Sequence, residues 1–167
     1  FKLDKIDKLK KYFIKWDNFL LEKNQIQLFY HWSAFTDNND QPASNPPWGK
    51  LVSMDINTGK IIWEKNIGKL NDNEDANDMT GTLNYGGVAL SEGGIVFATG
   101  TADGYVYALN SKNGKILWQY KMNAAGSCPP ILYEVDGKQY LSIISTGGYY
   151  AEYKNKDSTI YTFAIDE

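Results

Sequence analysis

Few side chains in this sequence have the type and spacing that catalysis requires. His31 is the only histidine, and a lone imidazole could act as a general base. No residue near it in the sequence supplies an orienting partner, so we interpret His31 as a structural or surface residue. Cys128 is the only cysteine and lies beside Pro129 and Pro130 at the start of a predicted strand. Without a neighbouring cation or helix N-terminus to activate its thiol, Cys128 is predicted to be a small buried residue.

Two further patterns resemble ligand sites only superficially. Four carboxylates gather in the stretch KLNDNEDANDMTG, namely Asp72, Glu74, Asp75 and Asp78. They lack the alternate spacing, central glycine and terminal glutamate of an EF-hand loop, so we interpret the stretch as a solvated loop. Glycines at 86–87, 93–94, 100, 104 and 114 are each followed by a strand-like run. A phosphate-binding loop is followed by a helix instead, so these glycines are predicted to be turn positions.

Composition excludes several classes of function. The 167-residue chain has a net charge of −3, and none of its 17 basic residues is arginine. It therefore lacks the concentrated positive charge and the bidentate guanidinium groups that nucleic-acid binding uses. A single cysteine forms neither an internal disulfide nor a Cys-x-x-Cys-His haem motif. No run approaches the ~18 apolar residues of a membrane-spanning helix, so we expect membrane association only through sequence outside this chain.

A repeat with a period of 55 residues organises the chain. The stretch that begins at Gly49, GKLVSMDINTGKIIWE, returns at Gly104 as GYVYALNSKNGKILWQ. Each copy predicts two strands joined by a tight turn, because a β-rich run leads to Asp55 or Asn110 and then to a glycine that tolerates positive φ. A repeat of this length with several short strands is typical of a propeller blade.

The predicted strands are short and are separated by turn residues. A complete four-stranded blade is predicted within Tyr85–Lys121, and the closing TIYTFAIDE is interpreted as a partial third copy of the repeat. The Asp-Gly of the segment VDGK, 135–138, predicts a hairpin. The other predicted strands are Leu51–Met54, Lys60–Lys65, Pro129–Glu134 and Lys138–Ser145.

Three stretches carry a family resemblance: HWSAFTDNNDQPASNPPWGKLVSMDINTGKIIW, GTLNYGGVALSEGGIVFATGTADGYVYALNSKNGKILW and ILYEVDGKQYLSIISTGG. They resemble the C-terminal blades of quinoprotein dehydrogenases of the membrane glucose dehydrogenase and pyranose dehydrogenase type, which use pyrroloquinoline quinone (PQQ). The recurring small residue, Asp or Asn, Gly-Lys and Trp is similar to the family's tryptophan-docking motif. In that family, tryptophans at the places of Trp63 and Trp118 lie flat between neighbouring blades.

The expected fold is therefore all-β: a partial β-propeller of two to three four-stranded blades, preceded by one amphipathic helix. The helix is predicted over 1–22, a strand and linker over 23–47, and the blades over 48–167. The helix could pack on a neighbour or lie on a membrane surface. It also resembles the tail of a cytochrome c domain that some relatives carry at this point.

The resemblance implies a sugar or alcohol dehydrogenase in the periplasm that passes electrons to a cytochrome c haem or to ubiquinone. PQQ and Ca²⁺ are the implied cofactors, and haem c is possible in the full-length protein. The family's catalytic base and calcium ligands lie upstream, so no catalytic residue or metal ligand is assigned here, and the chain alone is expected to be inactive. The alternative is a non-catalytic scaffold of the outer-membrane assembly type, which shares the docking repeats.

The segment GTLNYGG, 81–87, resembles the part of these dehydrogenases that faces the cofactor. Asn84, Tyr85 and Gly86 are therefore the predicted cofactor-binding residues. An amide both donates and accepts hydrogen bonds, a phenol packs on a flat ring, and glycine lets a backbone come close. In the structural alternative, Asn84 caps a turn and Tyr85 fills the core. Three tyrosines further on, Tyr149, Tyr150 and Tyr153, could edge a ligand pocket or cover the rim.

Overall fold

A computed structural model describes residues 35–38, 41–147 and 155–164, which form nine β-strands and no helix. The chain divides into two compact units, Phe1–Phe35 and Thr36–Glu167, and all nine strands belong to the second. The predicted helix over 1–22, the strand that follows it and His31 lie outside the described residues. So do the three tyrosines between 149 and 153.

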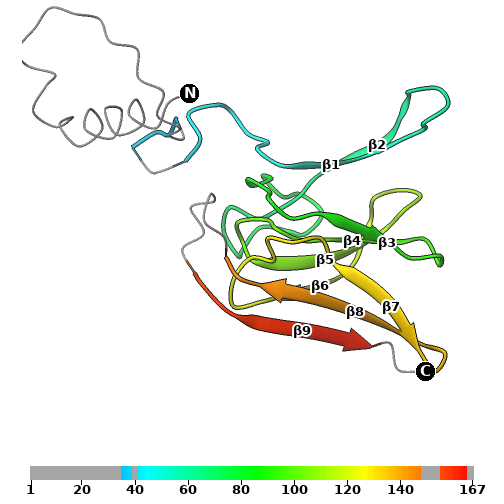
Figure 1. The fold of residues 1–167 in the computed structure, drawn as a ribbon. Helices are drawn as coiled ribbons and strands as arrows, with labels where there is room; N and C mark the ends of the chain where they lie inside the picture. Colours follow the sequence, from blue (N-terminus) through cyan, green and yellow to red (C-terminus); the bar gives the residue numbers. More distant parts are fainter. Residues whose placement is uncertain (1–34, 39–40, 148–154, 165–167) are drawn as a thin grey trace, which may run out of the picture. The chain divides into compact units, whose positions relative to one another are not determined.

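The nine strands form three antiparallel sheets (Figure 1). Sheet 1 contains β1 (Lys50–Met54) and β2 (Ile61–Asn66). Sheet 2 has the order β3-β4-β5-β6, with β3 Val88–Leu90, β4 Ile95–Ala98, β5 Tyr105–Asn110 and β6 Ile116–Lys121. Sheet 3 contains β7 (Ile131–Val135), β8 (Lys138–Ser145) and β9 (Thr159–Ala164). Every predicted strand within the described residues is confirmed to within a few residues.

The two copies of the repeat have the same backbone geometry. Asp55 and Asn110 each donate a backbone hydrogen bond across the turn, to Lys60 at 2.9 Å and to Lys115 at 2.8 Å. The turn glycines have φ values of 68° and 69°, which residues with a Cβ rarely adopt. The strand register also shifts at the same place, between Ser53 and Met54 in one copy and between Ala108 and Leu109 in the other. The repeat read from the sequence is therefore a structural repeat.

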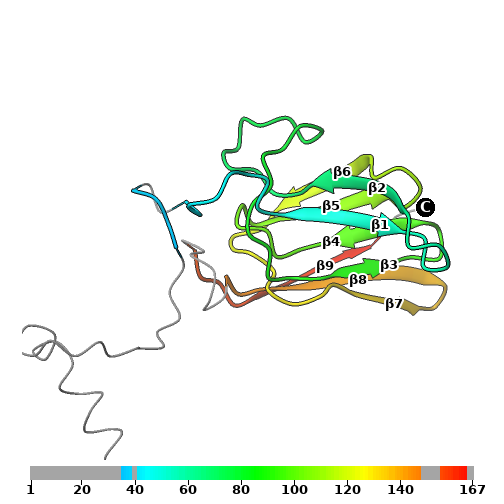
Figure 2. The same cartoon turned by 90° about the horizontal axis from the view of Figure 1, so that it is seen from above.

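Strand β5 supplies the centre of the core because both of its faces are covered. Val106 and Ala108 face sheet 3, where they pack with Leu141 and Ile143 of β8 and with their own sheet's Phe97. The alternate residues Tyr107 and Leu109 face the opposite way, toward the side of sheet 1. A strand buried on both faces shows a continuous apolar run instead of alternation. The three sheets are therefore stacked in chain order, and Figure 2 shows β1 and β2 over β5 from above.

Trp63 joins sheet 1 to sheet 2 as expected. Its indole Nε1–H donates a 2.8 Å hydrogen bond to the carbonyl of Ser111, in the turn between β5 and β6. Its ring covers Gly114, where an added Cβ would lie only 2.7 Å from the indole Cε3. Gly114 of the second repeat thus provides the packing surface for Trp63 of the first repeat.

Trp118, at the same place in the second repeat, is packed less completely. Its ring meets Phe163 of β9 edge-on at a centroid distance of 5.1 Å, which joins sheet 2 to sheet 3. It remains 38% exposed, and within the described part of the chain its indole N–H has no hydrogen-bond acceptor. A cavity of about 350 Å³ lies beside it, lined by apolar residues of both sheets that include Phe97 and Leu132.

The prediction that Cys128 is buried is wrong, because its side chain is exposed. The backbone at this position is fixed from sheet 2, since the hydroxyl of Thr99 donates a 2.9 Å hydrogen bond to the Cys128 carbonyl. The adjacent Pro129 packs so closely on Gly87 that an added Cβ there would lie 2.8 Å from its ring. The ring of Pro129, itself an exposed residue, therefore occupies the space next to Gly87, and the thiol does not.

Candidate functional site

The predicted cofactor segment lies at the end of sheet 2 where β3 begins. Asn84 is exposed, and its side-chain Oδ1 accepts a 2.9 Å hydrogen bond from the backbone N–H of Gly86. This is an Asx turn, so the part of the structural alternative in which Asn84 caps a turn is confirmed. The amide Nδ2 is not used in that turn, and the described residues offer it no partner. Among the described residues, Asn84 therefore leaves its two amide donors available.

Tyr85 does not fill the core, because 41% of it is exposed at the surface of the same turn. Its backbone N–H donates to the carbonyl of Gly100 at 3.0 Å. This hydrogen bond holds the backbone of Tyr85 against the neighbouring segment, while its side chain stays partly exposed.

A short backbone ladder fixes this segment against residues 99–102. Asn84 and Thr101 form an isolated antiparallel bridge, and the N–H of Ala102 donates to the Leu83 carbonyl at 3.2 Å. On the other side of the turn, the N–H of Thr99 donates to the Gly87 carbonyl at 3.1 Å. The position of Asn84 thus depends on the extended backbone of residues 99–102.

Gly86 is required by the protein's own backbone. A Cβ at this position would lie 2.3 Å from the carbonyl oxygen of Thr99. Conversely, a Cβ on Gly100 would lie 2.0 Å from the Gly86 nitrogen, and Gly100 has a φ of 89°. The two glycines let the segment around Gly86 and the segment 99–102 approach closely. The space next to Gly86, where a ligand was expected, is occupied by the backbone of residues 99–100.

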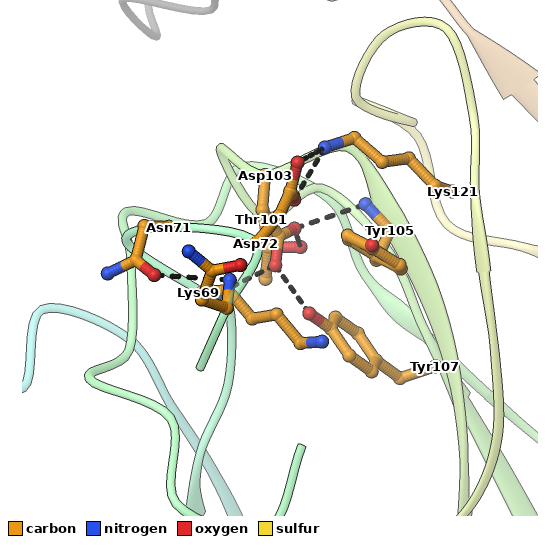
Figure 3. Close-up of polar contacts among 9 residues, drawn as sticks. Lys69, Asn71, Asp72, Thr101, Asp103, Tyr105, Tyr107 and Lys121 are labelled. Atoms are coloured by element: carbon orange, nitrogen blue, oxygen red, sulfur yellow. Dashed lines mark hydrogen bonds and ion pairs between the residues drawn. The ribbon is translucent and has the colours of Figure 1, made fainter. Parts of the chain in front are cut away.

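Next to this ladder, the carboxylate of Asp103 binds four donors (Figure 3). Its Oδ1 accepts hydrogen bonds from the hydroxyl of Thr101 at 2.5 Å and from the N–H of Tyr105 at 3.1 Å. Its Oδ2 accepts from the N–H of Lys69 at 2.6 Å and from the phenol of Tyr107. We call this arrangement the Asp103 cluster. It connects the loop after β2 to the β4–β5 turn and to β5.

Two lysines border the Asp103 cluster (Figure 3). Lys69 is buried, and its Nζ lies 5.0 Å from the ring centroid of Tyr105. The Nζ of Lys121 lies 5.3 Å from the same centroid and forms a 2.6 Å ion pair with Asp72. Both distances are within the range of cation–π attraction. One carboxylate of the predicted acidic loop therefore serves to connect that loop to the end of β6.

Another carboxylate of the acidic loop, that of Glu74, forms hydrogen bonds within the loop. Glu74 accepts hydrogen bonds from the N–H and the hydroxyl of Thr80, at 2.8 Å and 2.9 Å. Burial acts to raise the pKa of Glu74, but these hydrogen bonds outweigh it and lower the pKa. Among the described residues, no group of three or more His, Cys, Asp or Glu side chains is arranged to hold a metal ion.

Tyr107 has a strongly perturbed phenol. Its side chain is fully buried, and burial is the largest cause that raises its pKa well above the ordinary value. The negative charge of Asp103 and the hydrogen bond to it act in the same direction, because both disfavour a second anion. The phenol therefore remains a neutral donor to the carboxylate.

This phenol predicts a specific loss of stability in alkali. An unfolded tyrosine ionises with a pKa near 10, whereas the folded pKa of Tyr107 is higher. Its contribution to stability is therefore complete below about pH 10 and is lost as the pH rises further. Above about pH 10, Tyr107 is expected to lower the free energy of unfolding by at most about 1.4 kcal/mol for each further pH unit. Urea denaturation at about pH 9 and pH 11 measures this decrease in unfolding free energy. The decrease should be larger in the unchanged protein than in Tyr107→Phe, and equal decreases would contradict the prediction.

The sequence identified the turn but not the Asp103 cluster beside it. Of the predicted site residues, the structure places Asn84, Tyr85 and Gly86 together in one exposed turn. The segment Thr-Ala-Asp-Gly, 101–104, was visible only as a turn signal before β5. Three donors of the cluster lie within four residues of Asp103, but Lys69 lies 34 residues away, so no local pattern reveals the whole cluster.

Comparison with known proteins agrees with the repeat and the docking geometry. The family model of the glucose/ethanol/alcohol dehydrogenase β-propeller domain matches residues 7–141. Three stacked antiparallel sheets are consistent with a partial propeller of this kind. The chain therefore belongs to the PQQ-dependent glucose/alcohol dehydrogenase family, whose members are quinoprotein oxidoreductases.

Individual relatives cover most of this chain but a small part of their own length. Quinoprotein glucose dehydrogenase A of Acinetobacter calcoaceticus is 33% identical over 69% of this chain and 15% of its own length. Quinoprotein glucose dehydrogenase of Escherichia coli K12 is 36% identical over 65% of this chain and 14% of its own. Among solved structures, the quinohemoprotein alcohol dehydrogenase of Comamonas testosteroni superimposes with a TM-score of 0.55 at 28% identity, covering 76% of this chain and 18% of that one.

No helix in the described part of the chain has both the length and the apolar character needed to cross a membrane.

Proposed function

We propose that this chain is the C-terminal part of a dehydrogenase that oxidises a sugar or alcohol with PQQ. The family membership supports the reaction class, and the relatives named above are glucose and alcohol dehydrogenases. PQQ, when bound, would supply the oxidant for the carbinol carbon of the substrate. The dehydrogenase names of the relatives favour this function over a non-catalytic scaffold.

The proposed role of this chain is to bind the quinone and not to carry out the proton transfer. The observation that supports this role is the exposed Asn84 amide, whose Nδ2 donors have no partner in the described part of the chain. Such donors suit the carbonyl and carboxylate oxygens of PQQ. Tyr85 beside it is 41% exposed, and a phenol ring is a side chain that packs on flat ligands. The hydroxyls of Thr99 and Thr101 are buried and already bonded, so they are not proposed as contacts.

The remaining components are proposed for the full-length protein. Ca²⁺ and the carboxylate base are assigned to segments outside this chain. A haem c or ubiquinone is proposed as the electron acceptor, and the periplasm as the location. No residue of sheets 1 to 3 is assigned to any of these components.

The decisive variant for the quinone site is Asn84→Asp in the full-length protein. Aspartate retains the oxygen that accepts from Gly86, so the turn is preserved, but it replaces the two amide donors with a negative charge. Loss of a hydrogen bond to a charged group costs about 1.5–3 kcal/mol, which corresponds to a PQQ dissociation constant about 10- to 150-fold larger. Titration of the cofactor-free protein with PQQ measures this effect. Tyr85→Ala is expected to weaken binding as well.

Asn110→Asp provides a matched control. Asn110 forms the same kind of turn, with its Oδ1 accepting from the N–H of Lys112 at 2.9 Å, but it lies at the opposite end of sheet 2. The first repeat already carries aspartate at this place, Asp55. The control is expected to bind PQQ normally. Normal binding by Asn84→Asp and Tyr85→Ala as well would place the quinone site outside this chain.

A further inference from the structure

We propose that Asp103 is a positioning residue for the quinone-binding turn: its carboxylate fixes the 99–102 segment against which Asn84 is held. This inference rests on the proposed function of that turn. Asp103 itself is half-buried and directs both carboxylate oxygens at the protein's own donors. Its effect on a ligand is therefore indirect.

The first step of the connection runs through Thr101. This residue is fully buried, and its hydroxyl donates to Asp103 Oδ1 at 2.5 Å. On its backbone side, Thr101 is the bridge partner of Asn84. A shift of Thr101 would therefore move the strand segment that sets the position of the Asn84 amide.

The second step ties the same segment to the loop that follows sheet 1. Asp103 Oδ2 accepts from the backbone N–H of Lys69 at 2.6 Å. Thr82 strengthens the connection, because its hydroxyl accepts a 3.1 Å hydrogen bond from the N–H of Ala102. The 99–102 segment is thus tied both to Asp103 and to Thr82, which lies two residues before Asn84.

The set of four donors explains why a carboxylate is needed here. Two of the donors are backbone N–H groups, of Lys69 and Tyr105, one on each oxygen. Asparagine has one oxygen and one amide nitrogen, so in either orientation it leaves one of these backbone groups facing another donor. The hydroxyls of Thr101 and Tyr107 can reverse and accept, whereas a backbone N–H cannot. Asp103→Asn therefore changes the side-chain shape very little, but it leaves one backbone N–H group without its acceptor.

The test compares two hydroxyl deletions at the same carboxylate in the full-length protein. Thr101→Val removes the donor that lies opposite Asn84, and Tyr107→Phe removes the donor that lies in the core of sheet 2. Both leave Asp103 its backbone partners. We expect Thr101→Val and Asp103→Asn to weaken PQQ binding about tenfold, and Tyr107→Phe to change it less than about twofold while lowering stability. Circular dichroism of each cofactor-free variant confirms that folded protein is compared.

A double variant decides whether Asp103 acts through Asn84. If it does, Asp103→Asn combined with Asn84→Asp binds PQQ no more weakly than Asn84→Asp alone, because the group being positioned is already lost. Fully additive losses would overturn the inference, and so would normal binding by Thr101→Val. If Asn84→Asp binds normally, the proposed quinone turn itself fails. If Asn84→Asp is weakened but Asp103→Asn is not, only the positioning role fails.

Discussion

Replacing Trp63 with alanine is expected to lower the free energy of unfolding by about 3–5 kcal/mol. The indole loses its packing on Gly114 and its 2.8 Å hydrogen bond to the Ser111 carbonyl, so sheets 1 and 2 lose the side chain that joins them. Trp118→Ala should cost about half as much, because 38% of Trp118 is already exposed. Urea denaturation followed by circular dichroism gives both values.

The control for the tryptophan prediction is Trp63→Phe. A phenyl ring still covers Gly114 but cannot donate to Ser111, so the cost should be smaller, with about 1 kcal/mol due to the hydrogen bond. Equal losses for alanine at Trp63 and Trp118 would contradict the asymmetry between the two docking sites. A Trp63→Ala variant as stable as the unchanged protein would contradict the docking role altogether.

Gly100→Ala is expected to have an effect of similar size, above about 4 kcal/mol. The new Cβ would lie 2.0 Å from the Gly86 nitrogen, a contact with backbone that no rotamer change can relieve. The φ of 89° adds backbone strain for any residue with a side chain. We expect the segments 83–87 and 99–102 to separate, which hydrogen exchange at Tyr85 and Ala102 should show as lost protection.

Gly137→Ala is the matched control for this glycine. Gly137 also has a positive φ, 77°, but nothing lies within 4 Å of the place where its Cβ would be. The substitution therefore carries only the conformational cost of a left-handed residue, about 1–2 kcal/mol. If the two alanine variants were equally stable, the close approach of the two segments would not be what requires glycine at position 100.

The sequence by itself determined the strands and the repeat. These features depend on local preferences: apolar runs, turn glycines and an Asx residue at a fixed place before the glycine, as in Asp55 and Asn110. The same repeat placed Trp63 and Trp118 at equivalent positions, and the family resemblance implied that both contact the neighbouring sheet. The turn at Asn84 was also visible, because an Asn two residues before a glycine forms a hydrogen bond within a few residues.

Only the tertiary structure decided which of these residues are buried and what they bind. Cys128 was expected inside, but Pro129 occupies the space against Gly87 and the thiol is exposed. The need for Gly86 comes from Thr99 and Gly100 on the opposite segment. The Asp103 cluster draws a donor from Lys69, far away in the sequence, and no periodic pattern encodes such a pairing. Packing between segments distant in the sequence fixes these contacts, and they appear only once the sheets are stacked.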